Sequence, residues 1–523
     1  MKKFIKTSVI GLAATLALLG GCTKNFDDLN TDNSKLAKMN NVSLDFLFST
    51  AQNRGIFSGN NAQGTFQLFE ALFSDLQAQY FATTKTSFPS DRNVMQDNWL
   101  GPSWTYFYGN AYPQMDEVLK LTKEGELADP IKNAMAKVWK VFMFMPVTDY
   151  WGAVPYTDAG SGKNVILYDK QEFIYKDFLK LLNEASAVLG TYNGTGKFFE
   201  KGDLIYGGDV KKWAKFCNSL HLRVAMRISK VDPNLAKTEA EAAIAAPGGL
   251  LTLAADNAFM KVTTVTLNPL SHISSFGEFR MSAAMESVLK GYNDPRLQKF
   301  FDPVGTTTTY KGVRNGLSAD QITLPVNSAA NNSNINSSFG VANKFIAPFP
   351  LFNAAETWFL MAEAKLNGWN TGAGTAKEYY ENGISASMER WGVTDANAIA
   401  NYKVGTSTPA PLGDMFNTPA MSNIPVVFGA SEAVQREQIG TQKWLGLYPY
   451  SPEAWSEFRR TGFPKLYPRV NSDNADAPAN DPASVRRTPY PGIETSTNPK
   501  GLASGIANLG GPDKVSTRLW WNP

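Results

Sequence analysis

Apolar residues recur at three- and four-residue steps along most of this chain, which is the spacing of one face of an α-helix. Between residues 213 and 228 this face carries Trp213, Leu220 and Val224, and Lys211 and Lys212 fall on the opposite face. Between 172 and 189 the apolar positions are Ile174, Phe178, Leu181, Leu182, Ala185, Val188 and Leu189. Both segments are therefore predicted to form amphipathic helices.

The same spacing predicts helices in seven further segments: 44–58, 63–81, 104–122, 130–145, 353–367, 375–390 and 431–446. Their lengths and their rough pairing favour antiparallel helix hairpins of the tetratricopeptide kind, although no clean 34-residue period is visible. Residues 250–350 differ, because Thr, Asn, Gly and Ser dominate there, and we expect short strands and long loops. A second loop is expected over 471–484. The predicted fold is mainly α, a tetratricopeptide-like helix-pair scaffold with a loop-rich irregular subdomain.

The N-terminus carries an export signal. Lys2, Lys3 and Lys6 precede an apolar run of eleven residues, Val9 to Leu19, which is too short to span a bilayer. The run ends in Leu19-Gly20-Gly21-Cys22, which resembles the lipobox of bacterial lipoproteins, in which the Cys is acylated; the alternative is an ordinary signal cleaved nearby. We predict a signal peptide over 1–21, a tether over 22–42 that is lipidated at Cys22, and one binding domain over 43–523.

Composition narrows the class of protein. The net charge is +3 and no Lys/Arg run occurs, so nothing indicates a nucleic-acid partner. If Cys22 is lipidated, Cys217 is the sole remaining cysteine, which excludes an intrachain disulfide in the mature chain. No other apolar stretch is long enough to span a bilayer, so the lipid is expected to be the membrane anchor.

No catalytic constellation is apparent. The chain has two His residues, and His221 lies within a predicted helix, where a structural role is favoured. His272 lies in a predicted loop, where ligand contact is more plausible. Two His and one free Cys make a zinc site improbable, and neither a metal nor a cofactor is expected. A glycosidase pair among the many Asp and Glu residues stays open.

Several segments in a fixed order carry a family resemblance. They are DYWGAVPYTDAG (149–160), NSLHLRVAMRISKVDP (218–233), YNDPRLQKFFDP (292–303), NAAETWFLMAEAKLNGW (353–369), YYENGISASMERWGV (379–393), IGTQKWLGLYPYSPEAWSEFRRTGFPKLYP (439–468), RRTPYPGIETSTNPKG (486–501) and GGPDKVSTRLWWNP (510–523). In this order behind a lipobox, the chain resembles the SusD/RagB family of outer-membrane nutrient-binding lipoproteins. The residues of these segments, Trp444, Trp455 and Trp521 among them, are predicted mostly to pack the scaffold.

A sugar-binding surface needs aromatic rings for the apolar faces of pyranoses and planar polar groups for their hydroxyls. The predicted loop 80–99 supplies both kinds of side chain, as does a second segment around 272–310. The candidate ligand residues are Phe88, Asp91, Arg92, Asn98 and Trp99 in the first segment, and His272, Arg280 and Tyr310 in the second.

The resemblance implies a lipoprotein on the cell exterior that captures an oligosaccharide or polysaccharide and delivers it to a TonB-dependent transporter of the SusC kind. It implies binding without catalysis. Two alternatives remain at this point: a peptide-binding member of the same family, and a surface glycan hydrolase.

Overall fold

The structure is a computed structural model that describes residues 39–57, 63–262, 267–339 and 347–523. The chain divides into two compact units, Met1–Leu44 and Asp45–Pro523, and the description below concerns the second. The predicted signal peptide, Cys22 and most of the predicted tether lie outside the described residues.

Helices make up most of the described chain, and the amphipathic periodicity predicted their positions well. The first half contains α3 (Asn41–Gly55), α4 (Gln63–Phe66), the π-helical turn η1 (Gln67–Ser74), α5 (Asp75–Gln77), α6 (Asp97–Tyr106), the π-helical turn η3 (Phe107–Ala111), α7 (Tyr112–Lys123), α8 (Pro130–Trp151), α9 (Gln171–Leu189), α10 (Val210–Arg227) and α11 (Pro233–Ala245). The last third contains α16 (Ala354–Leu366), α17 (Ala376–Arg390), α18 (Ala396–Lys403), α19 (Glu432–Leu447), α20 (Ser451–Thr461), α21 (Ile493–Thr497) and α22 (Pro499–Asn508).

Side-chain caps set several of the helix starts. The Asp209 carboxylate accepts hydrogen bonds from Lys211 N at 3.0 Å and Lys212 N at 3.2 Å, which satisfies two of the free amides at the start of α10. Thr375 and Glu378 form a reciprocal capping box at the start of α17. The local sequence thus encodes these helix starts.

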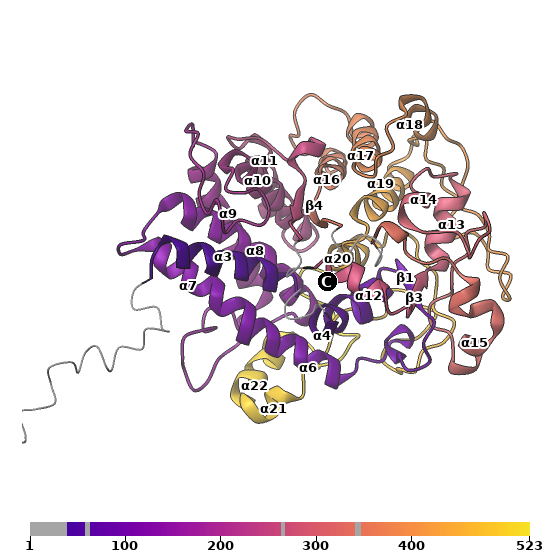
Figure 1. The fold of residues 1–523 in the computed structure, drawn as a ribbon, viewed down its shortest axis with the longest axis horizontal. Helices are drawn as coiled ribbons and strands as arrows, with labels where there is room; N and C mark the ends of the chain where they lie inside the picture. Colours follow the sequence, from indigo (N-terminus) through magenta and orange to yellow (C-terminus); the bar gives the residue numbers. More distant parts are fainter. Residues whose placement is uncertain (1–38, 58–62, 263–266, 340–346) are drawn as a thin grey trace, which may run out of the picture. The chain divides into compact units, whose positions relative to one another are not determined.

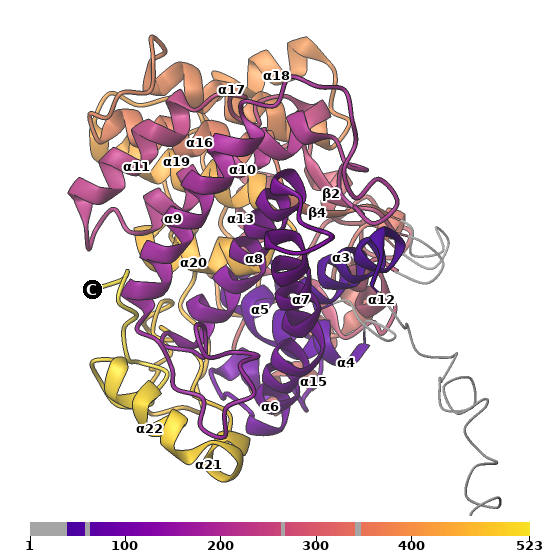
Figure 2. The ribbon, with the colours of Figure 1, turned by 90° about the vertical axis from the view of Figure 1, so that its left-hand side faces the viewer.

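Successive helices pack on one another as the predicted hairpins require. Helix α7 packs on α8, α8 on α9, α9 on α10 and α10 on α11, and the last third adds α16 on α17 and on α19. Figure 2 shows α8 to α11 side by side, with α16 and α19 next to them. The helix-pair scaffold is confirmed.

The middle of the chain is irregular, as predicted, with one exception. It contains β2 (Ala258–Met260), α12 (Pro269–Ser274), β3 (Phe279–Met281), α13 (Ala283–Gly291), α14 (Leu297–Phe300), α15 (Ala319–Thr323), four 3-10 turns and β4 (Phe349–Phe352). Helix α13 was not expected. Ser282 caps it, and the buried Met285, Val288 and Leu289 give it an apolar face. A helix of nine residues is too short for its period to stand out within a Thr- and Asn-rich region.

The family motifs meet in a buried ion network, called the ion hub below. It contains five cations and five carboxylates, all buried: Arg223, Arg227, Lys443, Arg459 and Arg460, with Asp149, Glu356, Glu363, Glu453 and Glu457. Arg223 binds Glu356 through two hydrogen bonds of 2.6 and 2.7 Å, and Arg227 reaches Glu453 at 2.6 Å. The indole of the buried Trp521 donates to Asp149 Oδ1 at 2.9 Å, which ties the C-terminus to α8. The structural role predicted for these motifs is confirmed.

Candidate functional site

A short two-stranded ribbon joins the two segments that carry the candidate ligand residues. Strand β1 (Phe81–Thr83) pairs antiparallel with β3, so that Thr83 faces Phe279 and Ala82 faces Arg280. Thr84 N continues the pairing by donating to Glu278 O at 3.0 Å. In Figure 1, β1, β3 and α12 lie together. Two regions that are far apart in the sequence therefore form one surface.

Aromatic rings cluster beside this ribbon. Phe88 contacts the Trp99 ring edge-to-face at 6.0 Å and stacks with Phe279 at 5.8 Å. All three rings are half-buried, so each keeps an accessible part. At the end of α12 the His272 and Phe276 rings lie 5.4 Å apart, and Phe276 is 36% exposed. Ile273 and Ser274 of α12 line one small pocket with Phe279, so the two groups of rings belong to neighbouring segments. We call Phe88, Trp99 and Phe279, together with the His272 and Phe276 pair, the aromatic surface.

The predicted loop over 80–99 is wrong at its end, because Trp99 belongs to the first turn of α6. Gln96 precedes the helix without a side-chain cap, and Gly101 and Pro102 lie inside it, so the sequence gives little sign of its start. The ring of Trp99 also touches Phe73 of η1 at 6.4 Å, and this contact fixes the orientation of the indole. Helical backbone thus holds the ring more firmly than a loop would.

Two of the candidates in the first segment have partners inside the protein. The buried Asp91 carboxylate accepts hydrogen bonds from Asn315 Nδ2 at 2.7 Å and Gly316 N at 3.2 Å. Burial raises the pKa of Asp91, and the charge of Arg469 opposes that rise. Arg92 Nε binds Asp473 Oδ2 at 2.6 Å, in the predicted 471–484 loop. Asp91 and Arg92 therefore secure the turn that presents Phe88.

The three candidates of the second segment, Arg280, His272 and Tyr310, also differ in their surroundings. Arg280 is half-buried and donates to Ala329 O at 2.8 Å and to Phe279 O at 2.7 Å, and burial lowers its pKa. Burial likewise lowers the pKa of His272. Tyr310 ends the 304–309 turn, where partial burial and the charge of Asp302 raise its pKa. Of these three candidates, His272 is part of the aromatic surface.

Asn98 opens onto a depression along α6. The hollow has a volume of about 510 Å³ and is lined by Thr65, Asp97, Asn98, Gly101, Pro102, Thr105, Tyr106, Asn110 and Ile493. Asn98, in the lining of the depression, directly precedes Trp99 in the first turn of α6. The exposed amide of Asn98 and the half-buried ring of Trp99 are thus neighbours on the same helix.

Some of the polar groups beside the aromatic surface were not predicted from the sequence. Gln67 Nε2 donates to Glu278 Oε2 at 2.9 Å beside Phe279, and burial raises the pKa of Glu278. No local pattern links residues 67 and 278. Asp97, Asn98 and Thr105 do lie on one face of α6, and these polar positions would have been visible if the start of α6 had been predicted correctly.

The chain belongs to the SusD/RagB family. The protein-family model described as SusD and RagB outer membrane lipoprotein matches residues 24–522, which is nearly the whole sequence. The predicted resemblance is confirmed. No helix among the described residues has the length and apolar character needed to cross a membrane.

Solved structures of homologues match the fold closely. A chitin-binding SusD homologue from Flavobacterium johnsoniae is 34% identical with a TM-score of 0.83, over 92% of this chain and 98% of that one. A SusD homologue from Bacteroides vulgatus is 30% identical with a TM-score of 0.83, over 91% and 97% of the two chains. A SusD-like protein from Bacteroides thetaiotaomicron is 31% identical with a TM-score of 0.80, over 92% and 98%. No curated protein matches the chain.

Proposed function

We propose that this protein is a surface lipoprotein that binds a glycan at the aromatic surface and passes it to a TonB-dependent transporter of the SusC kind. The observation that carries the proposal is the meeting of Phe88, Trp99 and Phe279 near the depression on α6, whose lining includes Asn98 and Thr105. A pyranose ring stacks its C–H face on such rings, and its hydroxyls require amide and hydroxyl partners close by.

The kind of glycan is inferred from a relative. The Flavobacterium homologue is described as chitin-binding. Oligomers of N-acetylglucosamine are therefore the first ligands to test. We infer binding without turnover, so an oligosaccharide recovered after incubation keeps its length. A shortened product, abolished by one Asp or Glu substitution, would favour the hydrolase alternative.

Trp99→Ala is expected to weaken glycan binding by about 1–3 kcal/mol, by analogy with base–aromatic stacking, or roughly ten- to a hundredfold in Kd. The removed indole supplies a stacking face next to Asn98. Calorimetric titration with N-acetylglucosamine oligomers gives the affinity, and the thermal midpoint of the same variant reports on folding.

Trp358→Ala is the matched control. Trp358 is also a half-buried helical Trp, and its ring stacks on Tyr379 at 5.8 Å, away from the aromatic surface. This control is expected to lose stability and to keep its affinity, whereas Phe276→Ala is expected to lose affinity with little loss of stability. Unchanged binding by both Trp99→Ala and Phe276→Ala would refute the proposed site.

Lipid at Cys22 is expected to be the only membrane attachment, since no other apolar run in the sequence is long enough to span a bilayer. A variant in which residues 23–523 follow an ordinary signal peptide lacks this Cys. This variant is expected in the soluble fraction after carbonate washing. Cys217→Ala in the native chain is the control and is expected to stay with membranes. Retention of the Cys22-free chain in the membrane fraction would disprove lipid anchoring.

A further inference from the structure

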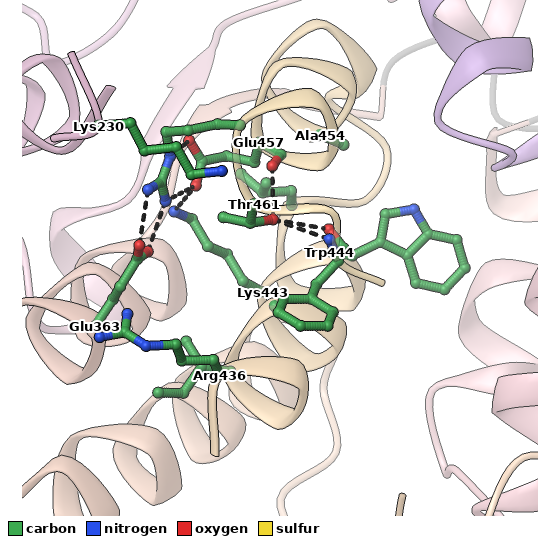
Figure 3. A pocket seen from close by; sticks show the side chains of 13 residues that line it. Lys230, Glu363, Arg436, Lys443, Trp444, Ala454, Glu457 and Thr461 are labelled. Carbon is green, nitrogen blue, oxygen red and sulfur yellow. Dashed lines mark hydrogen bonds and ion pairs between the residues drawn. The ribbon is translucent and has the colours of Figure 1, made fainter. Parts of the chain in front are cut away.

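A half-open pocket lies beside the ion hub, between α16, α19 and α20 (Figure 3). Its volume is about 110 Å³, which approaches that of a cavity known to hold one benzene molecule. None of its lining residues belongs to the aromatic surface. The lining is Lys230, Glu363, Arg436, Ile439, Gly440, Lys443, Trp444, Leu447, Ala454, Glu457, Arg460, Thr461 and Phe463.

One wall of the pocket is apolar. Ile439, Trp444 and Leu447 follow helical spacing on α19, and all three are buried. Phe463 faces them after α20, and it packs so closely on Gly440 that a Cβ atom there would lie 2.4 Å from the Cβ of Phe463. This wall suits a hydrocarbon ring or branched chain.

The other wall is charged, with four cations, Lys230, Arg436, Lys443 and Arg460, and two carboxylates, Glu363 and Glu457. Inside the ion hub the charges balance, and Lys443 Nζ uses one of its three donors on Glu457 Oε2 at 2.5 Å. Lys230 lies outside the hub at the pocket mouth, and its ammonium group has no hydrogen-bond or ion-pair partner among the described residues. Arg436 binds Glu432 at 2.7 Å on the outer side of α19. The positive charge of Lys230 is therefore not paired directly with any carboxylate that lines the pocket.

Figure 3 shows Lys230 and Lys443 at the same hollow, together with the Glu363 and Glu457 carboxylates. A carboxylate between the Lys230 and Lys443 ammonium groups would satisfy donors that the protein leaves unused. Burial and the charge of Arg460 lower the pKa of Lys230, and Glu363 and Glu457 oppose this, while Arg518 adds to it. A bound anion would favour the charged form of Lys230.

We propose that this pocket binds a small organic monocarboxylate whose body is apolar, with Lys230 and Lys443 on the carboxylate and Ile439, Leu447 and Phe463 around the hydrocarbon. The site is separate from the glycan surface, and its ligand is of a different chemical class.

Benzoate is the probe, and calorimetry and saturation-transfer NMR on the purified protein are the measurements. Benzoate is expected to bind at least tenfold more tightly than benzyl alcohol, which keeps the ring without the charge, and than acetate, which keeps the charge without the ring. Affinity is expected to fall in alkaline solution, where Lys230 loses its proton.

Lys230→Met is expected to weaken benzoate binding at least fivefold without a change in thermal midpoint, because this side chain lies at the exposed mouth. Lys237→Met, an exposed lysine of α11 paired with Glu241, is the control and should bind as the native protein does. Absence of benzoate binding, or equal affinity in the two lysine variants, would overturn the proposal. Equal affinity for benzoate and acetate would overturn the apolar part of it.

Discussion

Glu457→Gln is expected to destabilise the protein by about 3–5 kcal/mol, the usual cost of removing one partner from a buried ion pair. The Glu457 carboxylate binds Arg227 at 2.8 Å, Arg460 at 2.7 Å and Lys443 at 2.5 Å, and the change leaves three buried cations with one carboxylate fewer. Burial alone would raise the pKa of Glu457, but the charges of Arg460, Lys443 and Arg227 hold it well below its usual range.

The measurement is urea unfolding near pH 7, followed by tryptophan fluorescence. Because the folded-state pKa of Glu457 is depressed, its contribution is present above the unfolded pKa and is lost as the pH falls toward the folded value, so the difference between native and variant shrinks in acid. Glu432→Gln, which removes a carboxylate that is 64% exposed, is expected to change stability by less than about 0.5 kcal/mol. An equally small effect of Glu457→Gln would contradict the prediction and would indicate that water reaches the ion hub.

Asp75→Asn is expected to stabilise the protein at pH 8. Burial raises the pKa of Asp75 from 3.8 to about 7, and its charge in turn helps to raise the pKa of the buried Glu70. Keeping Asp75 ionised inside the fold therefore costs about 4 kcal/mol above pH 7, as an order of magnitude.

The raised pKa of Asp75 sets the direction of the pH dependence. The protonated Asp75 favours the folded state fully below the unfolded value of 3.8, and that stability is lost as the pH rises to about 7. Unfolding curves from pH 4 to pH 8 should therefore decline less steeply in Asp75→Asn than in the native protein. Asp476→Asn, at a carboxylate that is 41% exposed, should leave the slope unchanged. A variant less stable than the native protein at pH 8 would contradict the prediction.

The sequence predicted the scaffold because its helices are long and amphipathic. Segments such as 172–189 carry enough turns for the apolar period to be unmistakable, and the observed α9 spans Gln171–Leu189. Helix α13 and the start of α6 were missed, because short helices and weak caps leave no comparable signal.

The surroundings of the candidate residues could be predicted only in part, because no local pattern says which way a polar loop side chain points. Phe88 and Trp99 lie against each other, and Phe88 stacks on Phe279. Asp91 and Arg92 contact partners far along the chain, Asn315 and Asp473. The pairing of Thr83 with Phe279 joined two segments that had been predicted separately. Contacts of this range arise from the tertiary fold and have no counterpart in residue spacing.

The three-residue pairing of β1 with β3 also has an evolutionary consequence. The ring-bearing segments are attached to the body through backbone hydrogen bonds and a few polar anchors, whereas the ion hub is built from other parts of the chain. Backbone pairing tolerates many side chains. Substitutions in both segments can therefore accumulate while the scaffold stays the same.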